Sequence, residues 1–202
     1  MKRFLSLLAV LTASLLLAAE AHAQFGFVLG LTSSSVRMSS EDAISLYHAG
    51  LTYKFNLPSG FSIQPDILYQ VKGANVGNLD TAADEDFKLK TGFVEHSLAF
   101  GWGPRFAAFR PYLFAEPFVG YRVSSSDKGN DTFRDWARQA KNNFEYGFGL
   151  GAGIEIADHL QLSGQWFNNL GPMFPDSSGS PSEPLEHVKN FQGIKFSLAF
   201  LF

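Results

Sequence analysis

Eight segments of the chain alternate large apolar residues with small or polar ones at every second position. In the last segment Phe196, Leu198 and Phe200 share one face, and Lys195 and Ser197 share the other. Successive side chains of a strand point to opposite faces, so this alternation predicts β-strands. After residue 23 no apolar run is long enough for a membrane-spanning helix, which needs about 20 residues. The sequence therefore predicts an all-β fold.

The lengths of the strands and of their connections predict the architecture. The short connections are residues 57–60, 103–108 and 157–158, and the long polar ones are 34–45, 73–90, 124–142 and 170–189. Short periplasmic turns that alternate with long extracellular loops are typical of outer-membrane barrels with an even strand number. We predict an eight-stranded antiparallel up-and-down transmembrane β-barrel. Its expected strands are 25–32, 47–55, 61–72, 94–102, 112–122, 144–156, 160–166 and 194–202.

The two faces of the strands differ in size as well as polarity. The apolar face is rich in aromatic residues, whereas Gly, Ser, Ala and Gln dominate the other face. Aromatic side chains from eight strands would overfill a narrow barrel, so the apolar face is predicted to meet lipid. A soluble lipocalin-like barrel, with the apolar face inside, is the alternative. Charged residues of both signs on the opposite face are predicted to pair across the lumen: Lys54, Asp66, Glu95, Glu116, Arg122, Glu145, Glu155 and Lys195.

The N-terminal residues indicate export. Lys2 and Arg3 precede an apolar run over residues 4–19, and Ala21-His22-Ala23 then offers the small residues that signal peptidase recognises. We expect residues 1–23 to be a cleaved signal peptide and residues 24–202 to form one barrel domain. An uncleaved N-terminal membrane helix is the alternative. The expected location is the bacterial outer membrane, with its lipids as the surrounding partner.

Several segments resemble a known family. They are Gly26-Phe27-Val28-Leu29-Gly30-Leu31, the third strand from Phe61 to Lys72-Gly73, and Arg110-Pro111-Tyr112-Leu113. The chain resembles the outer-membrane β-barrel family that includes the PorT-like proteins and, more loosely, the eight-stranded OmpA and OmpX barrels. The C-terminus resembles the signal read by the barrel-assembly machinery, which implies that machinery as a partner during insertion. Ser197 stands where glycine is usual, and the elements carrying the signal are Phe200 and Phe202.

No residue pattern predicts catalysis, a cofactor or a metal. Ser97 and His96 are adjacent in a strand, so their side chains point to opposite faces. His48 with lumenal Asp66 or Glu95 would make a buried dyad, but a polar plug is favoured. The acidic run 80–86 lacks the ligand spacing of a calcium loop and is interpreted as solvated. A net charge of −3 gives no reason to expect nucleic acid.

The third long connection offers a contact for a partner. Thr132 and Asp135 resemble a capping box, and Phe133 and Trp136 lie on one apolar stripe at helical spacing. This pattern favours a short helix packed on the barrel rim. The alternative is an aromatic contact for an extracellular partner or the outer leaflet.

Three function classes follow from these observations. A structural or interaction barrel that presents its surface loops is preferred. A narrow porin-like or transport component comes second, because the interior of an eight-stranded barrel is normally filled by side chains. An outer-membrane lipid-modifying enzyme comes third, because no catalytic constellation is recognisable.

Overall fold

The computed structural model describes residues 23–35, 43–76, 87–128, 143–170 and 191–202, and the structural statements below concern these residues. Three expectations lie outside them. These are the signal peptide up to residue 22, the acidic run 80–86, and the contact residues Phe133 and Trp136. No helix in the described ranges is long and apolar enough to cross a membrane.

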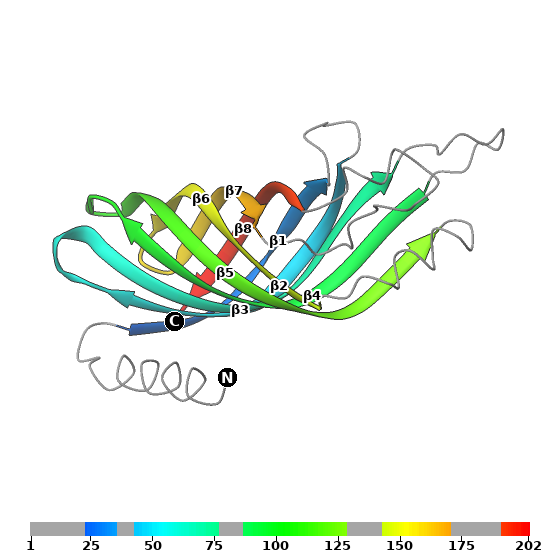
Figure 1. Ribbon diagram of the computed structural model, residues 1–202. Helices are drawn as coiled ribbons and strands as arrows, with labels where there is room; N and C mark the ends of the chain where they lie inside the picture. Colours follow the sequence, from blue (N-terminus) through cyan, green and yellow to red (C-terminus); the bar gives the residue numbers. More distant parts are fainter. Residues whose placement is uncertain (1–22, 36–42, 77–86, 129–142, 171–190) are drawn as a thin grey trace, which may run out of the picture.

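Eight antiparallel strands form one closed barrel, and each strand pairs with its neighbours in sequence (Figure 1). β8 pairs with β1 and closes the ring. The predicted fold class, an eight-stranded up-and-down barrel, is confirmed. The strands are β1 (Ala23–Ser35), β2 (Ile44–Asn56), β3 (Phe61–Val76), β4 (Phe87–Trp102), β5 (Phe109–Lys128), β6 (Phe144–Ile156), β7 (Leu160–Asn169) and β8 (Gln192–Leu201).

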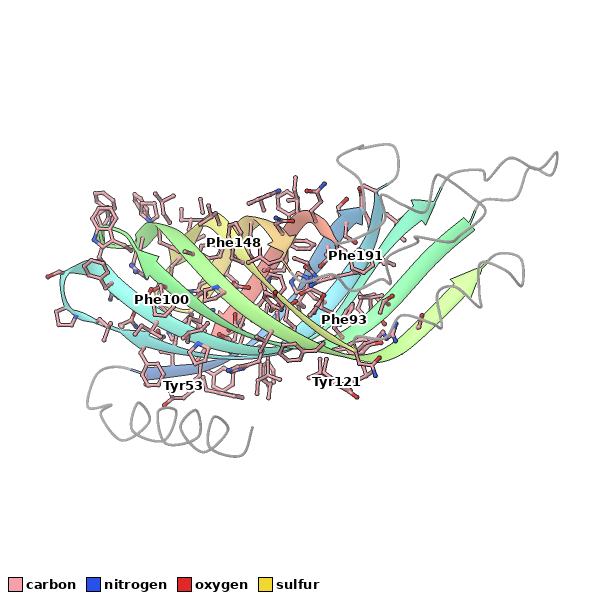
Figure 2. All side chains as sticks on the ribbon, viewed as in Figure 1. Tyr53, Phe93, Phe100, Tyr121, Phe148 and Phe191 are labelled. Carbon is pink, nitrogen blue, oxygen red and sulfur yellow. The ribbon has the colours of Figure 1, made fainter. Side chains whose placement is uncertain are left out.

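The large apolar residues face outward, as the alternation predicts. On β1, Phe27 is 52% exposed, whereas its neighbour Val28 is buried. On β5, Leu113 is 64% exposed, and Phe118 on the opposite face is buried. Aromatic residues such as Phe100 and Tyr121 lie on the outside in the same way (Figure 2). The soluble alternative, with this face inside, is therefore wrong for the described strands.

The pairing of β1 with β8 leaves no open edge in the sheet. Its register runs from Gly26 opposite Leu201 to Ser35 opposite Gln192. Beyond it, the Phe202 amide donates to the Phe25 carbonyl at 2.8 Å, and the Phe25 amide donates to the Phe202 carbonyl at 3.2 Å. A closed sheet satisfies the backbone groups that lipid would otherwise leave unpaired.

The short connections all lie at one end of the barrel, which we call the short-turn end. Between β2 and β3 a 3₁₀ turn covers Pro58–Gly60, with positive φ at Ser59 (62°) and Gly60 (83°). Between β6 and β7, Ala157 (50°) and Asp158 (62°) also have positive φ. Two left-handed residues in succession match the twist of a hairpin, which explains how so few residues reverse the chain.

Three strands extend furthest beyond their predicted ends. β3 continues to Val76, β4 begins at Phe87 and β5 continues to Lys128, within segments expected to be loops. Backbone pairing persists out to Val76 opposite Phe87 and Lys88 opposite Lys128. We call residues 73–76, 87–91 and 123–128 the projecting sheet. It lies at the end of the barrel that carries the long connections, the long-connection end (Figure 1).

Candidate functional site

The interior of the barrel is filled by side chains rather than open. At the long-connection end four phenylalanines are buried, and two of them, Phe93 and Phe191, have ring centroids 6.5 Å apart. Figure 2 labels both of these rings. Small residues alternate with these large ones on the inward face, as a narrow barrel requires. The four buried rings are Phe93, Phe118, Phe167 and Phe191.

A chain of ion pairs runs through the interior and joins five strands. Lys72 Nζ on β3 lies 2.7 Å from Glu145 Oε1 on β6 and 2.9 Å from Glu95 Oε2 on β4. Glu95 Oε1 is also 3.7 Å from Lys195 Nζ on β8, which is 2.7 Å from Glu116 Oε1 on β5. We call these five residues the ion-pair chain. Its alternating charges let each buried group meet a counter-charge, which offsets the cost of removing it from water.

Lys72 has a second set of contacts in the aromatic layer. Its Nζ lies 4.5 Å from the ring centroid of Phe118, 5.1 Å from that of Phe167 and 5.4 Å from that of Phe93. A cation over an aromatic face is attracted by the ring quadrupole, and the attraction grows when water is excluded. The side chain has no solvent exposure. Lys72 therefore links the ion-pair chain to the buried phenylalanines, and we call these side chains that fill the interior the plug.

A separate ion-pair group lies near the short-turn end. Lys54 on β2 pairs with Glu155 on β6, and Arg110 Nη1 on β5 lies 3.4 Å from the same carboxylate. Gln161 Nε2 donates to Glu155 at 3.0 Å. Arg110 Nη2 also donates to the Gly60 carbonyl at 2.8 Å. Arg110 thereby ties the β2–β3 turn to the interior.

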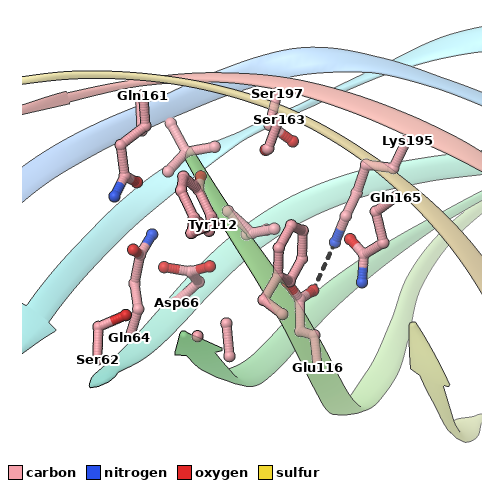
Figure 3. A pocket seen from close by; sticks show the side chains of 16 residues that line it. Ser62, Gln64, Asp66, Tyr112, Glu116, Gln161, Ser163, Gln165, Lys195 and Ser197 are labelled. Carbon is pink, nitrogen blue, oxygen red and sulfur yellow. Dashed lines mark hydrogen bonds and ion pairs between the residues drawn. The ribbon is translucent and has the colours of Figure 1, made fainter. Parts of the chain in front are cut away.

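A cavity of about 40 Å³ lies inside the barrel, and we call it the lumen cavity (Figure 3). Glu116 and Lys195 of the ion-pair chain line it, and so do Asp66 and Gln64 of β3. Its volume suffices for a few water molecules, because one water needs about 10–15 Å³. The remaining polar lining consists of Ser62, Tyr112, Gln161, Ser163, Gln165 and Ser197.

His48 has two hydroxyl partners inside the barrel. Its Nε2 lies 2.9 Å from Ser197 Oγ, and its Nδ1 lies 3.0 Å from Thr32 Oγ1. A serine next to an imidazole is the arrangement that activates a hydroxyl nucleophile. However, His48 and Thr32 are fully enclosed, and Ser197 lines the lumen cavity. The geometry is that of a hydrogen-bond network in which the imidazole is enclosed between two hydroxyls inside the barrel.

The structure places seven of the eight predicted lumen residues inside the barrel. The eighth, Arg122, is only half-buried. Its guanidinium donates to the side-chain oxygen Oδ1 of Asn143, the residue before β6, at 2.7 and 3.1 Å. The register between β4 and β5 shifts beside it, between Gly92 and Phe93. The residues found inside are Lys54, Asp66, Glu95, Glu116, Glu145, Glu155 and Lys195.

The predicted set lacks two cations that the structure brings into the interior. Lys72 belongs to the polar face of its strand, and this alternation was the signal that could have included it. Arg110 stands at the very start of β5, before Pro111, where no alternation precedes it. Within the described ranges, no group of three or more His, Asp or Glu residues is arranged to hold a metal.

The two C-terminal aromatics lie on the outer surface at the short-turn end. Phe200 and Phe202 are both more than half exposed. The ring centroid of Phe202 lies 5.4 Å from that of Phe25 and 6.4 Å from that of Phe200. They thus form part of an aromatic cluster beside the β1–β8 closure, where a membrane interface is expected to lie.

A closed antiparallel barrel with an apolar outer face and a charged interior is the architecture of outer-membrane β-barrel proteins. A sequence model described as "Outer membrane protein beta-barrel domain" matches residues 17–174. The chain therefore belongs to this family of outer-membrane proteins. No curated protein matches its sequence.

Three solved structures are among those similar to this chain. Neisserial surface protein A is 13% identical, covers 89% of this chain and 94% of its own, and gives a TM-score of 0.46. Ail, the attachment invasion locus protein of Yersinia pestis, is 7% identical, with coverages of 89% and 99% and a TM-score of 0.42. The outer membrane enzyme PagL is 10% identical, with coverages of 88% and 97% and a TM-score of 0.48.

Proposed function

We propose that this protein is a plugged outer-membrane barrel that serves as a structural or interaction barrel and presents its long-connection end to a partner outside the cell. The observation that carries the proposal is the filled interior. The buried phenylalanines around Lys72 occupy one end, and the group around Glu155 occupies the other. A barrel whose lumen is occupied in this way acts through its surface.

The projecting sheet offers the partner a rigid binding surface. β3, β4 and β5 contain 16, 16 and 20 residues, whereas the other strands contain 10–13. Backbone pairing keeps this extension ordered beyond the barrel. Binding residues held on a rigid scaffold lose less entropy when a partner arrives. Phe133 and Trp136, in the connection that follows β5, remain contact candidates from the sequence.

The two alternative functions have less support. A narrow pore needs a continuous water path, and the interior contains a cavity of only about 40 Å³ between side-chain layers. A lipid-modifying enzyme needs a nucleophile that lipid can reach, whereas the Ser197–His48 pair faces the lumen. We therefore propose that the chain is not an enzyme. We also propose that the chain belongs to the PorT-like branch of the family, because the strand segments named above resemble that branch.

Two measurements on the full-length protein test the proposal. In a planar bilayer, the refolded barrel is expected to give no ion-conductance steps. Reproducible steps that change in size in the double variant Glu116→Gln, Lys195→Gln would assign the function to the lumen instead.

The second measurement is photo-crosslinking in intact cells. A crosslinker replaces Ser124 in the projecting sheet or, as the matched control, Ser59 in the short-turn end; both serines are exposed. We expect a discrete adduct from position 124 that is absent from position 59. Adducts from position 59 alone would contradict an outward-facing interaction surface.

A further inference from the structure

The enclosed charges of the barrel do not balance. Among the described residues, nine charged side chains are buried. Four are cationic and five are carboxylates, so the interior carries one excess negative charge when all are ionised. The cations are Lys54, Lys72, Arg110 and Lys195, and the carboxylates are Asp66, Glu95, Glu116, Glu145 and Glu155.

The excess charge lies at Asp66. Each of the other eight side chains takes part in an ion pair, whereas Asp66 is in none of those between described residues. Asp66 is only 6% exposed, and its Oδ1 has no hydrogen-bond partner in the described part of the chain. An ionised carboxylate enclosed without a counter-charge is very costly. Asp66 therefore requires a positive ligand or a proton.

The surroundings of Asp66 supply both space and oxygen atoms. Asp66 lines the lumen cavity, together with side chains that carry amide or hydroxyl oxygens (Figure 3). Gln165 in the same lining is 3% exposed, and its Nε2 donor lacks a partner among the described residues, so a water in the cavity can accept from it. Hard cations prefer oxygen ligands of this kind, from carboxylates, amides, hydroxyls and water. The amide- and hydroxyl-bearing side chains of the same lining include Ser62, Gln64, Tyr112 and Gln161.

We propose that the lumen cavity binds one small monovalent cation of the size of Na⁺ on Asp66, with amide and hydroxyl oxygens and water completing its shell. A single positive charge cancels the single excess carboxylate. A divalent ion would overshoot that balance, since Lys195 already pairs with Glu116, the other carboxylate in the lining. A cavity of about 40 Å³ admits Na⁺ with a few waters but excludes a bulky cation such as choline.

The test compares unfolding of the full-length barrel in two salts. The protein is refolded into detergent micelles in NaCl or in choline chloride of equal ionic strength, and urea unfolding is followed by tryptophan fluorescence. Because only the folded barrel contains the site, Na⁺ at ten times its dissociation constant raises the folding constant about tenfold. In the Asp66→Asn variant the two salts are expected to give the same folding constant.

Glu145→Gln is the matched control, because Glu145 is a buried carboxylate of the ion-pair chain that does not line the lumen cavity. This variant is expected to be less stable in both salts yet to retain the Na⁺ effect. Equal unfolding of the unaltered protein in the two salts would overturn the proposal. So would a protonated-carboxyl infrared band at neutral pH that disappears in Asp66→Asn, since a proton would then be the occupant.

Discussion

At the residue scale, Lys72 is the charged group that joins the ion-pair chain to the buried phenylalanines. Its ammonium group meets two carboxylates, Glu95 and Glu145, and three aromatic rings. The Lys72 ammonium stabilises the barrel because it offsets the cost of burying the Glu95 and Glu145 carboxylates, which would otherwise lack this counter-charge. Surface pairs work differently, because water already solvates both charges.

Replacing Lys72 should therefore be far more damaging than replacing an exposed cation. Lys72→Met keeps the volume and removes the charge, and we expect it to lower the free energy of unfolding by about 3–5 kcal/mol. The control is Arg105→Gln, which breaks the half-exposed pair with Asp158 (3.2 Å) and should cost about 0–1 kcal/mol. Urea unfolding in detergent measures both variants. Equal losses would show that the ion-pair chain contributes no more than a surface pair.

The composition of the lumen could be predicted from single residues, but their pairing could not. Alternation shows which charged residues share the inward face of a strand, and this places Lys195 and Glu116 together inside. Their contact depends on the stagger between strands that lie across the barrel, and no local pattern encodes it. Arg122 illustrates the same limit. Alternation puts it on the inward face, but it lies near the long-connection end, where its guanidinium donates to Asn143 and is half-buried.

At the scale of the element, the inward and outward faces of a strand differ in how much room they leave. Gly151 on β6 faces inward, and a Cβ there would lie 2.4 Å from Phe114 Cζ and 2.6 Å from the Gly164 carbonyl oxygen. Gly164 on β7 faces outward, and its nearest neighbour would be Phe196 Cε1 at 3.3 Å. A Cβ at Gly151 would therefore collide with backbone as well as a side chain. A Cβ at Gly164 would meet only the Phe196 ring, which lies on the lipid face and can move.

Alanine at these two glycines should therefore have different effects. Gly151→Ala is expected to lower the free energy of unfolding by about 1–3 kcal/mol, because the added methyl group overpacks the interior. Gly164→Ala is expected to change it by less than about 0.5 kcal/mol. Thermal unfolding followed by circular dichroism measures both. If both variants lost the same stability, glycine would be required for strand flexibility and not for space.

Strand ends were harder to predict than strand centres. Alternation marks the part of a strand that has lipid on one side and a packed lumen on the other. Beyond that zone the pattern stops, although the backbone of β3, β4 and β5 goes on pairing to Val76, Phe87 and Lys128. Backbone hydrogen bonds need no particular side chain, so the polar residues from Lys72 onward gave no signal for the projecting sheet.

At the scale of the whole molecule, the chain termini close the barrel. β8 fills the gap between β7 and β1, and Phe202 adds two backbone hydrogen bonds to Phe25 beyond the last paired strand residues. The Phe202 ring packs among Phe25 and Phe27, with centroids 5.4 and 5.7 Å away. The C-terminal residue thus belongs both to the closure and to the expected assembly signal.

These two roles can be separated by a substitution. Phe202→Ser keeps the backbone bonds, so the purified chain should still fold in detergent, with a loss of about 1 kcal/mol from the ring contacts. In cells we expect the folded fraction in the outer membrane to fall several-fold, measured by the heat-dependent shift in gel mobility. Phe109→Ser removes another exposed aromatic near the short turns and is the control. Equal losses in cells from both variants would contradict a signal specific to Phe202.

The long-range ion pairs also constrain the route by which this chain enters a bilayer. Lys54 and Glu155 are 101 residues apart in sequence, Lys195 and Glu116 are 79 apart, and Lys72 and Glu145 are 73 apart. No two consecutive strands contain both members of any of these pairs. A hairpin inserted by itself would expose an unmatched charge to hydrocarbon, at a cost of several kcal/mol. We therefore expect the strands to meet their distant partners before or during the crossing, so that insertion and closure form a single concerted step.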